Sequence, residues 1–197
     1  MKLGFLASHN GSNMQAIIDA CRSGQIKAAP VVVISNNPDS GALQRARRES
    51  IPACHLSSRS HPDPAALEQA ILQALQQHET ELVILAGYMK KLGPAIISAY
   101  RNRILNIHPS LLPAYGGHGM YGEKVHHAVL QAGEKETGAS VHLVDEHYDN
   151  GRILAQTRVP VQPSDNINTL AARVLQQEHE LYVQTVADIV TGKLPLP

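Results

Sequence analysis

Two side chains that could carry out acyl chemistry lie two residues apart near the middle of the chain. Asn106 and His108 belong to an apolar, β-favouring stretch that starts at Ile104, and Pro109 ends it because proline cannot donate to a sheet ladder. Side chains two apart in a strand project to the same face. An amide that can stabilise an oxyanion and an imidazole that can move a proton near neutral pH should therefore leave the strand together. The alternative is a satisfied strand-end histidine beside a loop-capping asparagine.

Two carboxylates are candidates to join this pair. Asp149 precedes Asn150-Gly151, a sequence typical of a tight turn, so its side chain should be fixed in place. Glu178 falls on an apolar seam of a predicted helix, and a carboxylate there costs stability unless it is paired or faces a ligand. The seam is formed by Leu170, Val174 and Leu181. A core partner for Glu178 is the alternative.

The first residues of the chain predict a site for an anion. Residues 2–7 indicate a buried strand, residues 8–13 a turn rich in small polar residues, and residues 14–21 a helix. A strand, a glycine-containing turn and a helix present free N–H groups and a positive dipole end to a phosphate. The turn matches neither the Walker A nor the dinucleotide fingerprint. An ordinary turn with Ser12 or Asn13 as the helix cap is the alternative.

The elements that must position these residues alternate between strand and helix. Strands are predicted at 31–34, 52–55, 82–86 and 104–108, and helices at 41–49, 65–77 and 93–100. This alternation predicts an α/β fold of the Rossmann-like kind, with a mostly parallel twisted sheet and helices on both faces. Ligands bind such sheets at the carboxyl ends of the strands. The loops at 9–13, 87–92 and 106–113 should all leave strands at that edge.

After Pro113 the pattern changes. A glycine-rich loop (114–122) is followed by a predicted helix (124–132), a strand (140–144), an acidic turn (145–151), a second strand (153–161) and a long C-terminal helix. The long helix should run from Asn168 to about Ile189, with its cap in residues 164–168. With no repeat or linker, we expect one domain over 1–197, made of a phosphate-binding half (1–108) and a second half (109–197).

Composition narrows the function further. The 197 residues hold 17 Lys+Arg and 17 Asp+Glu, so there is no basic field to attract nucleic acid or a membrane surface. The two cysteines, Cys21 and Cys54, fit a reducing compartment better than a disulfide framework. The start of the chain has no signal-peptide pattern. We expect a cytoplasmic protein with small-molecule partners, and the oligomeric state stays open, a homodimer included.

A metal centre is not expected. The histidines of the second half fit no compact ligand motif. The adjacent pair His126 and His127 should point in different directions on a helix. The set is His118, His126, His127, His142 and His147.

Taken together, the motifs resemble the phosphoribosylglycinamide formyltransferase family of the folate-dependent formyltransferases. The resemblance covers essentially the whole chain. The Asn-x-His-Pro-Ser-x-Leu-Pro stretch is shared by the wider formyltransferase and formyl-folate hydrolase group. The Gly-Ser-Asn turn and the Gln-Glu-His segment narrow the resemblance to the enzymes that act on glycinamide ribonucleotide. The carrying segments are residues 10–18, 85–89, 106–113, 140–142, 149–151 and 177–179.

This resemblance implies a role for each segment. Asn106, His108 and Asp149 would form the catalytic trio, and no metal would be needed. Glycinamide ribonucleotide would be bound by Gly11, Ser12, Asn13, Leu175, Gln176, Gln177 and Glu178. The co-substrate 10-formyltetrahydrofolate would be bound by Met89, Lys90, Lys91, Leu92, Asn106, Asp145, Glu146, His147, Tyr148 and Asp149. The implied enzyme is a one-carbon transferase of de novo purine biosynthesis.

The sequence departs from the family pattern at two places. Many members carry an arginine, a folate contact, where this chain has Pro64; Arg59 in the same loop could replace it. The loop 116–122 is longer than the commoner family version, so its contacts cannot be assigned residue by residue.

The sequence also bears on three other functions. A formyl-tetrahydrofolate hydrolase would normally carry an N-terminal regulatory domain, and a methionyl-tRNA formyltransferase a basic C-terminal one; neither fits 197 residues of balanced charge. A non-catalytic folate- or nucleotide-binding regulator would not require Asn106, His108 and Asp149 together.

Overall fold

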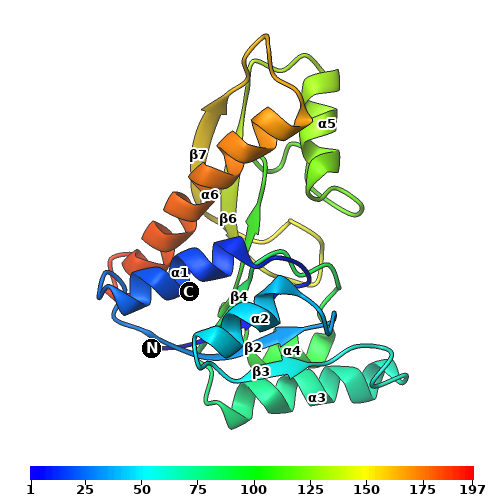
Figure 1. Ribbon diagram of the computed structural model, residues 1–197, viewed down its shortest axis with the longest axis vertical. Helices are drawn as coiled ribbons and strands as arrows, with labels where there is room; N and C mark the ends of the chain where they lie inside the picture. The colour runs from blue at the N-terminus through cyan, green and yellow to red at the C-terminus, as the bar shows by residue number, and fades with distance from the viewer. The chain divides into compact units, whose positions relative to one another are not determined.

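The computed structural model describes residues 1–197 and has the predicted α/β architecture (Figure 1). The strand order is β3-β2-β1-β4-β5-β6-β7. The strands are β1 (Lys2–Leu6), β2 (Ala29–Ser35), β3 (Ala53–His55), β4 (Leu82–Leu85), β5 (Ile104–His108), β6 (Glu136–Leu143) and β7 (Ile153–Pro160). The helices are α1 (Ser12–Arg22), α2 (Gly41–Arg48), α3 (Pro64–Gln77), α4 (Pro94–Ala99), α5 (Glu123–Gln131) and α6 (Ile167–Val190).

The predicted mostly parallel sheet and long last helix are confirmed. Strand β1 pairs in parallel with β2 and with β4, and β2 pairs in parallel with β3. Strands β6 and β7 are antiparallel. No helix combines the length and the hydropathy that a membrane crossing would need.

The chain forms two compact units. The first unit contains residues 1–105 and 186–197, and the second contains residues 106–185. The single domain with halves at 1–108 and 109–197 stays a prediction.

The first unit is built on right-handed crossovers. Helix α1 packs beside α2, and α3 packs beside α4 (Figure 1). The chain builds the sheet outward from β1 to β3 and then returns to add β4 on the other side of β1. With right-handed crossovers, this reversal places the pair α1 and α2 on one face of the sheet and the pair α3 and α4 on the other. The central strands are largely apolar because both of their faces are covered; Phe5, Val33 and Ile84 are fully buried, whereas the edge strand β3 is only partly buried.

The two thiols belong to the first unit. Cys21 lies on α1 and Cys54 on β3, and neither forms a disulfide. Burial raises the pKa of Cys21 to about 11, and burial also raises the pKa of Cys54. Both groups are therefore thiols rather than thiolates at neutral pH.

Helix α1 and strand β6 begin differently from what the sequence suggests. Gly11, in the left-handed region (φ 70°), is the N-cap of α1, and no side chain caps that helix, so neither Ser12 nor Asn13 does so. Strand β6 starts at Glu136 rather than at Ser140. Residues 136–139 have weak strand propensity, and their pairing with β7 over Gly138↔Arg158 and Thr137↔Val159 overrides it.

The second unit has its own apolar core. Helix α5, strand β7 and helix α6 meet there, and Figure 1 shows α5 and the first turns of α6 in this unit. The buried cluster consists of Val125, Val129, Val159, Leu170 and Val174.

On α6 the buried seam differs from prediction at one residue. It continues from Leu170 and Val174 to Glu178 and Tyr182, at four-residue spacing, whereas Leu181 is only partly buried. A strict i, i+4 row is the row that a helix of 3.6 residues per turn keeps on one face. Glu178 is therefore a buried carboxylate, as the seam predicted.

An ion pair fixes the start of α6. Arg173 donates to both carboxylate oxygens of Asp165 at 2.8 and 2.7 Å, and Asp165 also accepts from the amide of Gln162. The Arg173 guanidinium, with these other donors, outweighs the effect of burial and lowers the pKa of Asp165 far below its ordinary value. The predicted cap is confirmed, since Asn166 accepts from the amides of Asn168 and Thr169.

This pair yields a prediction about stability. Because the folded-state pKa of Asp165 is depressed, its contribution is present above the unfolded-state value and lost as the pH falls through the folded-state value. Asp165→Asn should lower Tm by about 2–4 °C at pH 7, and the gap to the wild type should narrow in acid. Thermal unfolding of both proteins, followed from pH 7 down into acid, measures the difference in Tm. A difference that does not change with pH would contradict the ion-pair account.

Candidate active site

Asn106 and His108 lie at the end of strand β5, as expected, and a second histidine, His142, orients the side-chain amide of Asn106. The Nδ1–H of His142 donates to the carbonyl of Leu143 at 2.8 Å, so Nε2 is an acceptor in the neutral ring and carries a hydrogen toward Asp149 only when the ring is protonated. Asn106 donates an Nδ2–H to this Nε2 at 3.0 Å. The amide of Asn106 is thereby oriented, and its second N–H stays available to a ligand.

His108 is 4% exposed, and both of its ring nitrogens face protein groups. Its Nε2 lies 2.8 Å from the carbonyl oxygen of Tyr115. Its Nδ1 lies 3.5 Å from Oδ2 of Asp149. Because a carbonyl can only accept, Nε2 carries a hydrogen, and Nδ1 is the nitrogen that can gain or lose a proton beside the carboxylate.

Asp149 occupies the tight turn that the sequence predicted. It has a left-handed backbone (φ 53°) and is 12% exposed. Its Oδ2 accepts from the amide of Gly117 at 2.9 Å, and its Oδ1 lies 3.5 Å from Nε2 of His142. One carboxylate therefore reaches both buried histidines. The structure thus brings together Asn106, His108 and Asp149, all within the second unit.

The charges of this cluster are coupled. Burial lowers the pKa of His108 below its ordinary value, although the Asp149 carboxylate and the Tyr115 carbonyl both act to raise it. Burial acts to raise the pKa of Asp149, but the neighbouring histidines and the amide of Gly117 outweigh burial, and its pKa lies below the ordinary value. A carboxylate that stays ionised beside a histidine of lowered pKa is typical of acid–base sites.

A buried polar network fixes the loop that follows β5. The hydroxyl of Ser140 donates to the carbonyl of Ser110 at 2.6 Å and accepts from the amide of Leu112 at 3.0 Å. Gln156 donates to that hydroxyl and to the carbonyl of Leu112. The loop is tied to β6 and β7, so the end of β5 is held rigidly.

The residues implied in ribonucleotide binding lie on α6 and at α1. On α6, Glu178 is 7% exposed, whereas Leu175 and Gln176 face solvent; Gln177 accepts from the hydroxyl of Thr157 at 3.3 Å. At α1, Gly11, Ser12 and Asn13 form the uncapped helix start. Such a start presents N–H groups and a positive dipole end to an anion.

The turn before α1 is held by an arginine of α2. Arg45 donates to the backbone carbonyl of Asn10 at 2.9 Å and to its side-chain oxygen at 3.1 Å. A Cβ at Gly11 would lie 2.9 Å from Cβ of Ala42, and its φ of 70° is also strained for other residues. Glycine is therefore required where the turn passes α2.

In the first unit, the predicted neighbourhood of the loops after β1 and β4 is confirmed. Ser8 donates its amide N–H to the carbonyl of Gly87 at 3.0 Å, and its hydroxyl accepts from the amide of Met89 at 2.7 Å. These bonds fix the start of the segment Met89, Lys90, Lys91 and Leu92, in which Leu92 is buried and both lysines are exposed.

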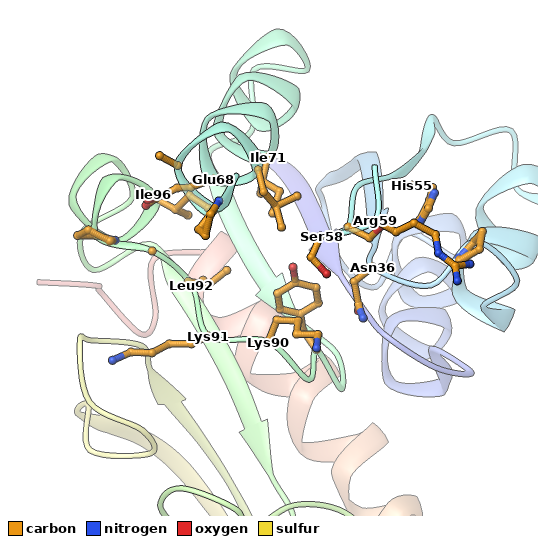
Figure 2. Close-up of a pocket in the computed structure, with 18 residues that line it drawn as sticks. Asn36, His55, Ser58, Arg59, Glu68, Ile71, Lys90, Lys91, Leu92 and Ile96 are labelled. Carbon is orange, nitrogen blue, oxygen red and sulfur yellow. Dashed lines mark hydrogen bonds between the residues drawn. The ribbon is translucent and has the colours of Figure 1, made fainter. Parts of the chain in front are cut away.

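A cavity of about 730 Å³ lies beside this segment, within the first unit. Figure 2 shows Ile71, Leu92 and Ile96 on one side and Asn36, Ser58 and Arg59 on another. Arg59 and Pro64 line the same cavity, together with Lys90. The carboxylate of Glu68 is occupied with the start of α4, since it accepts from the amides of Ala95 and Ile96. The wall is therefore apolar with cationic groups at its margin.

The remaining implied folate residues form an exposed turn in the second unit. Asp145 accepts from the amide of His147 at 2.8 Å, and the ring of Tyr148 meets that of His118 edge-on, with centroids 5.5 Å apart. Glu146 faces solvent. The five histidines of this half do not gather into a metal-binding group. As predicted, His126 and His127 point differently, one buried and one exposed.

Sequence reasoning missed two contributors. His142 was noted only as part of a motif and as a poor metal ligand, yet it orients Asn106 and approaches Asp149. Tyr115 was not singled out, because it acts on His108 through a backbone carbonyl that every residue type carries.

Comparison with known proteins identifies the family. The Formyl transferase family (Formyl_trans_N) matches residues 1–186. Phosphoribosylglycinamide formyltransferase of Escherichia coli is 38% identical over 100% of this chain and 90% of its own length. The chloroplastic phosphoribosylglycinamide formyltransferase of Vigna unguiculata is 44% identical over 94% of this chain, which spans only 59% of that relative.

A solved structure agrees with the sequence matches. Glycinamide ribonucleotide transformylase 1 from Symbiobacterium toebii superposes with a TM-score of 0.93 at 38% identity, over 100% of this chain and 91% of that one. Fold, trio and full-length similarity point the same way, and the chain belongs to the phosphoribosylglycinamide formyltransferases of the formyl transferase family.

Proposed function

We propose that this protein transfers the formyl group of 10-formyltetrahydrofolate to the amine of glycinamide ribonucleotide, a step of de novo purine biosynthesis. The observation that carries the proposal is the cluster of Asn106, His108 and Asp149, in which an oriented amide, a buried imidazole and an ionised carboxylate meet. Two free thiols support a reducing compartment, and we place the activity in the cytoplasm.

The reaction is a direct transfer. The substrate amine attacks the formyl carbon, and the carbonyl oxygen becomes an oxyanion. The free N–H of Asn106 and the Nδ1–H of protonated His108 donate to it, while Asp149 favours the charged imidazole. When the oxyanion collapses, the bond to N10 of the folate breaks. The proton lost by the amine reaches N10 through His108 or through a water held by Asp149.

The ribonucleotide is assigned to two segments. The uncapped start of α1 at Gly11, Ser12 and Asn13 takes the phosphate through backbone N–H groups. Leu175, Gln176, Gln177 and Glu178 contact the rest of the ribonucleotide, and Glu178 provides the charged contact. The carboxylate is 7% exposed on an apolar seam, where a charged acceptor suits a ligand hydroxyl or amine.

The folate is assigned to the residues that the family resemblance implies, namely Met89, Lys90, Lys91, Leu92, Asn106, Asp145, Glu146, His147, Tyr148 and Asp149. No metal takes part in the proposed chemistry.

Arg59 replaces the arginine that relatives carry at the position of Pro64. Both residues line one cavity with Lys90, and neither Arg59 nor Lys90 forms an ion pair within the protein. Both cations are thus available to the carboxylates of folate. Arg59→Ala should raise the KM for 10-formyltetrahydrofolate about 2–5-fold, the effect of one exposed ion pair, and leave the KM for the ribonucleotide unchanged.

Steady-state kinetics with each substrate varied in turn tests the role of Arg59. Arg48→Ala is the matched control, because Arg48 is an exposed arginine of the same unit. An unchanged KM for the folate in Arg59→Ala would reject the assignment.

The function itself is tested by mixing the protein with glycinamide ribonucleotide and 10-formyltetrahydrofolate and following release of tetrahydrofolate. Release that requires the ribonucleotide supports formyl transfer. Release without the ribonucleotide would instead mean a hydrolase. Binding of both ligands with no release would favour a regulator.

A further inference from the structure

Tyr115 reaches His108 through its backbone. The carbonyl of Tyr115 accepts from Nε2–H of His108 at 2.8 Å. As long as this bond is made, the neutral imidazole has one tautomer, with its hydrogen on Nε2, and Nδ1 faces Asp149. The direction of that carbonyl therefore decides which nitrogen of His108 can exchange a proton with a substrate.

The backbone at Tyr115 needs support to keep this direction. Its φ of 56° is in the left-handed region, which is unfavourable for a residue with a Cβ. The side chain supplies two anchors. The ring packs on the apolar core around Val125 and Val129, and the hydroxyl donates to Oε1 of Glu134 at 2.8 Å. Glu134, three residues after the end of α5, is exposed and free to act as this anchor.

We propose that Tyr115 is a positioning residue of the active site: the Tyr115–Glu134 hydrogen bond holds the Tyr115 carbonyl against His108 and so keeps Nδ1 of His108 as the proton-exchanging nitrogen. The inference rests on the proposed role of His108 in formyl transfer. It deepens that role, because it names the group that selects the reactive nitrogen.

The pH dependence of turnover separates a positioning role from a merely structural one, because only a positioning role predicts a shift of the pH profile in a known direction. The groups that act on His108 are the carboxylate of Asp149, the imidazoles of His142 and His126, and the Tyr115 carbonyl. The carbonyl acts to raise the pKa of His108. Protonated His108 is the active form, so activity falls as the pH rises through this pKa. Weakening the carbonyl contact should move that fall to lower pH.

Three variants separate the anchor from the fold. Tyr115→Phe keeps the ring and removes the hydroxyl, and Glu134→Ala removes the acceptor while leaving Tyr115 intact. Each should lower kcat about 3–10-fold, the range expected from loss of one hydrogen bond, with little change in either KM. Glu134→Gln keeps an acceptor oxygen and should restore the wild-type kcat and pH profile. Tyr121→Phe is the control, since Tyr121 lies in the same glycine-rich loop but is 47% exposed and outside the apolar core.

The decisive readout needs no turnover. In protein labelled with ¹⁵N-histidine, the nitrogen resonances of His108, assigned by their loss in His108→Ala, report which nitrogen is protonated. The wild type, Glu134→Gln and Tyr121→Phe should show the hydrogen on Nε2, and Tyr115→Phe and Glu134→Ala a mixture of tautomers. An unchanged tautomer together with an unchanged pH profile in both anchor variants would overturn the proposal. If His108→Ala keeps its activity, the proposed role of His108 fails instead, and if the wild type releases no tetrahydrofolate with both substrates present, the proposed function fails, whatever the tautomer.

Discussion

His108→Ala is expected to lower kcat about 10²–10³-fold, the usual cost of losing one oxyanion donor. The variant removes the imidazole that faces Asp149 through Nδ1 and with it the proposed Nδ1–H donor to the oxyanion. Because His108 itself is not among the residues assigned to either substrate, both KM values should change far less than kcat. Initial rates with each substrate varied in turn measure the three constants.

His127→Ala is the matched control for this prediction. His127 is an exposed histidine on α5, whereas His108 is buried. The control should keep wild-type turnover. A His108→Ala enzyme within a few-fold of the wild type would mean that Asn106 and the proximity of the two substrates suffice, and that the trio has been wrongly assigned.

Asp149→Asn should be nearly as damaging, with a loss of about 10²-fold in kcat. The asparagine keeps the size of the side chain and can still accept from Gly117, so the turn should survive. What disappears is the charge beside Nδ1 of His108 and Nε2 of His142. The protonated form of His108 then loses its counter-charge, and less of it exists at neutral pH.

The pH profile distinguishes this account from simple misfolding. The Asp149 carboxylate acts to raise the pKa of His108, so its removal lowers that pKa further. Since the protonated imidazole is the active form, the alkaline fall of kcat should shift to lower pH in Asp149→Asn. Asp39→Asn, at an exposed carboxylate outside the site, should leave the profile unchanged. An unshifted alkaline limb in Asp149→Asn would contradict the electrostatic role.

The sequence predicted those features that arise from local chemistry. Alternating apolar runs and helical periodicity were enough for the α/β class, because the central strands β1, β2 and β4 of the first unit are largely buried on both faces. The pair Asn106 and His108 could be found because strand geometry places side chains two apart on one face, and Asp149 because Asn150-Gly151 marks a tight turn.

The features that were not predicted depend on contacts distant in sequence. Strand β6 begins at Glu136 because β7 pairs with it, not because residues 136–139 favour a strand. The orientation of Asn106 comes from His142, 36 residues later. The tautomer of His108 is set by a carbonyl group, and a backbone group has no signature in the sequence.

The two protected thiols have a practical consequence for anyone who wishes to attach a probe. With a pKa of about 11, Cys21 is thiolate in roughly one molecule in 10⁴ at pH 7. Cys54 is shifted in the same direction. Maleimides and iodoacetamides react with the thiolate, so an exposed cysteine introduced at a surface position such as Gln73 would be modified far faster than either native one. Site-selective fluorophore labelling should therefore be feasible with both native cysteines left in place.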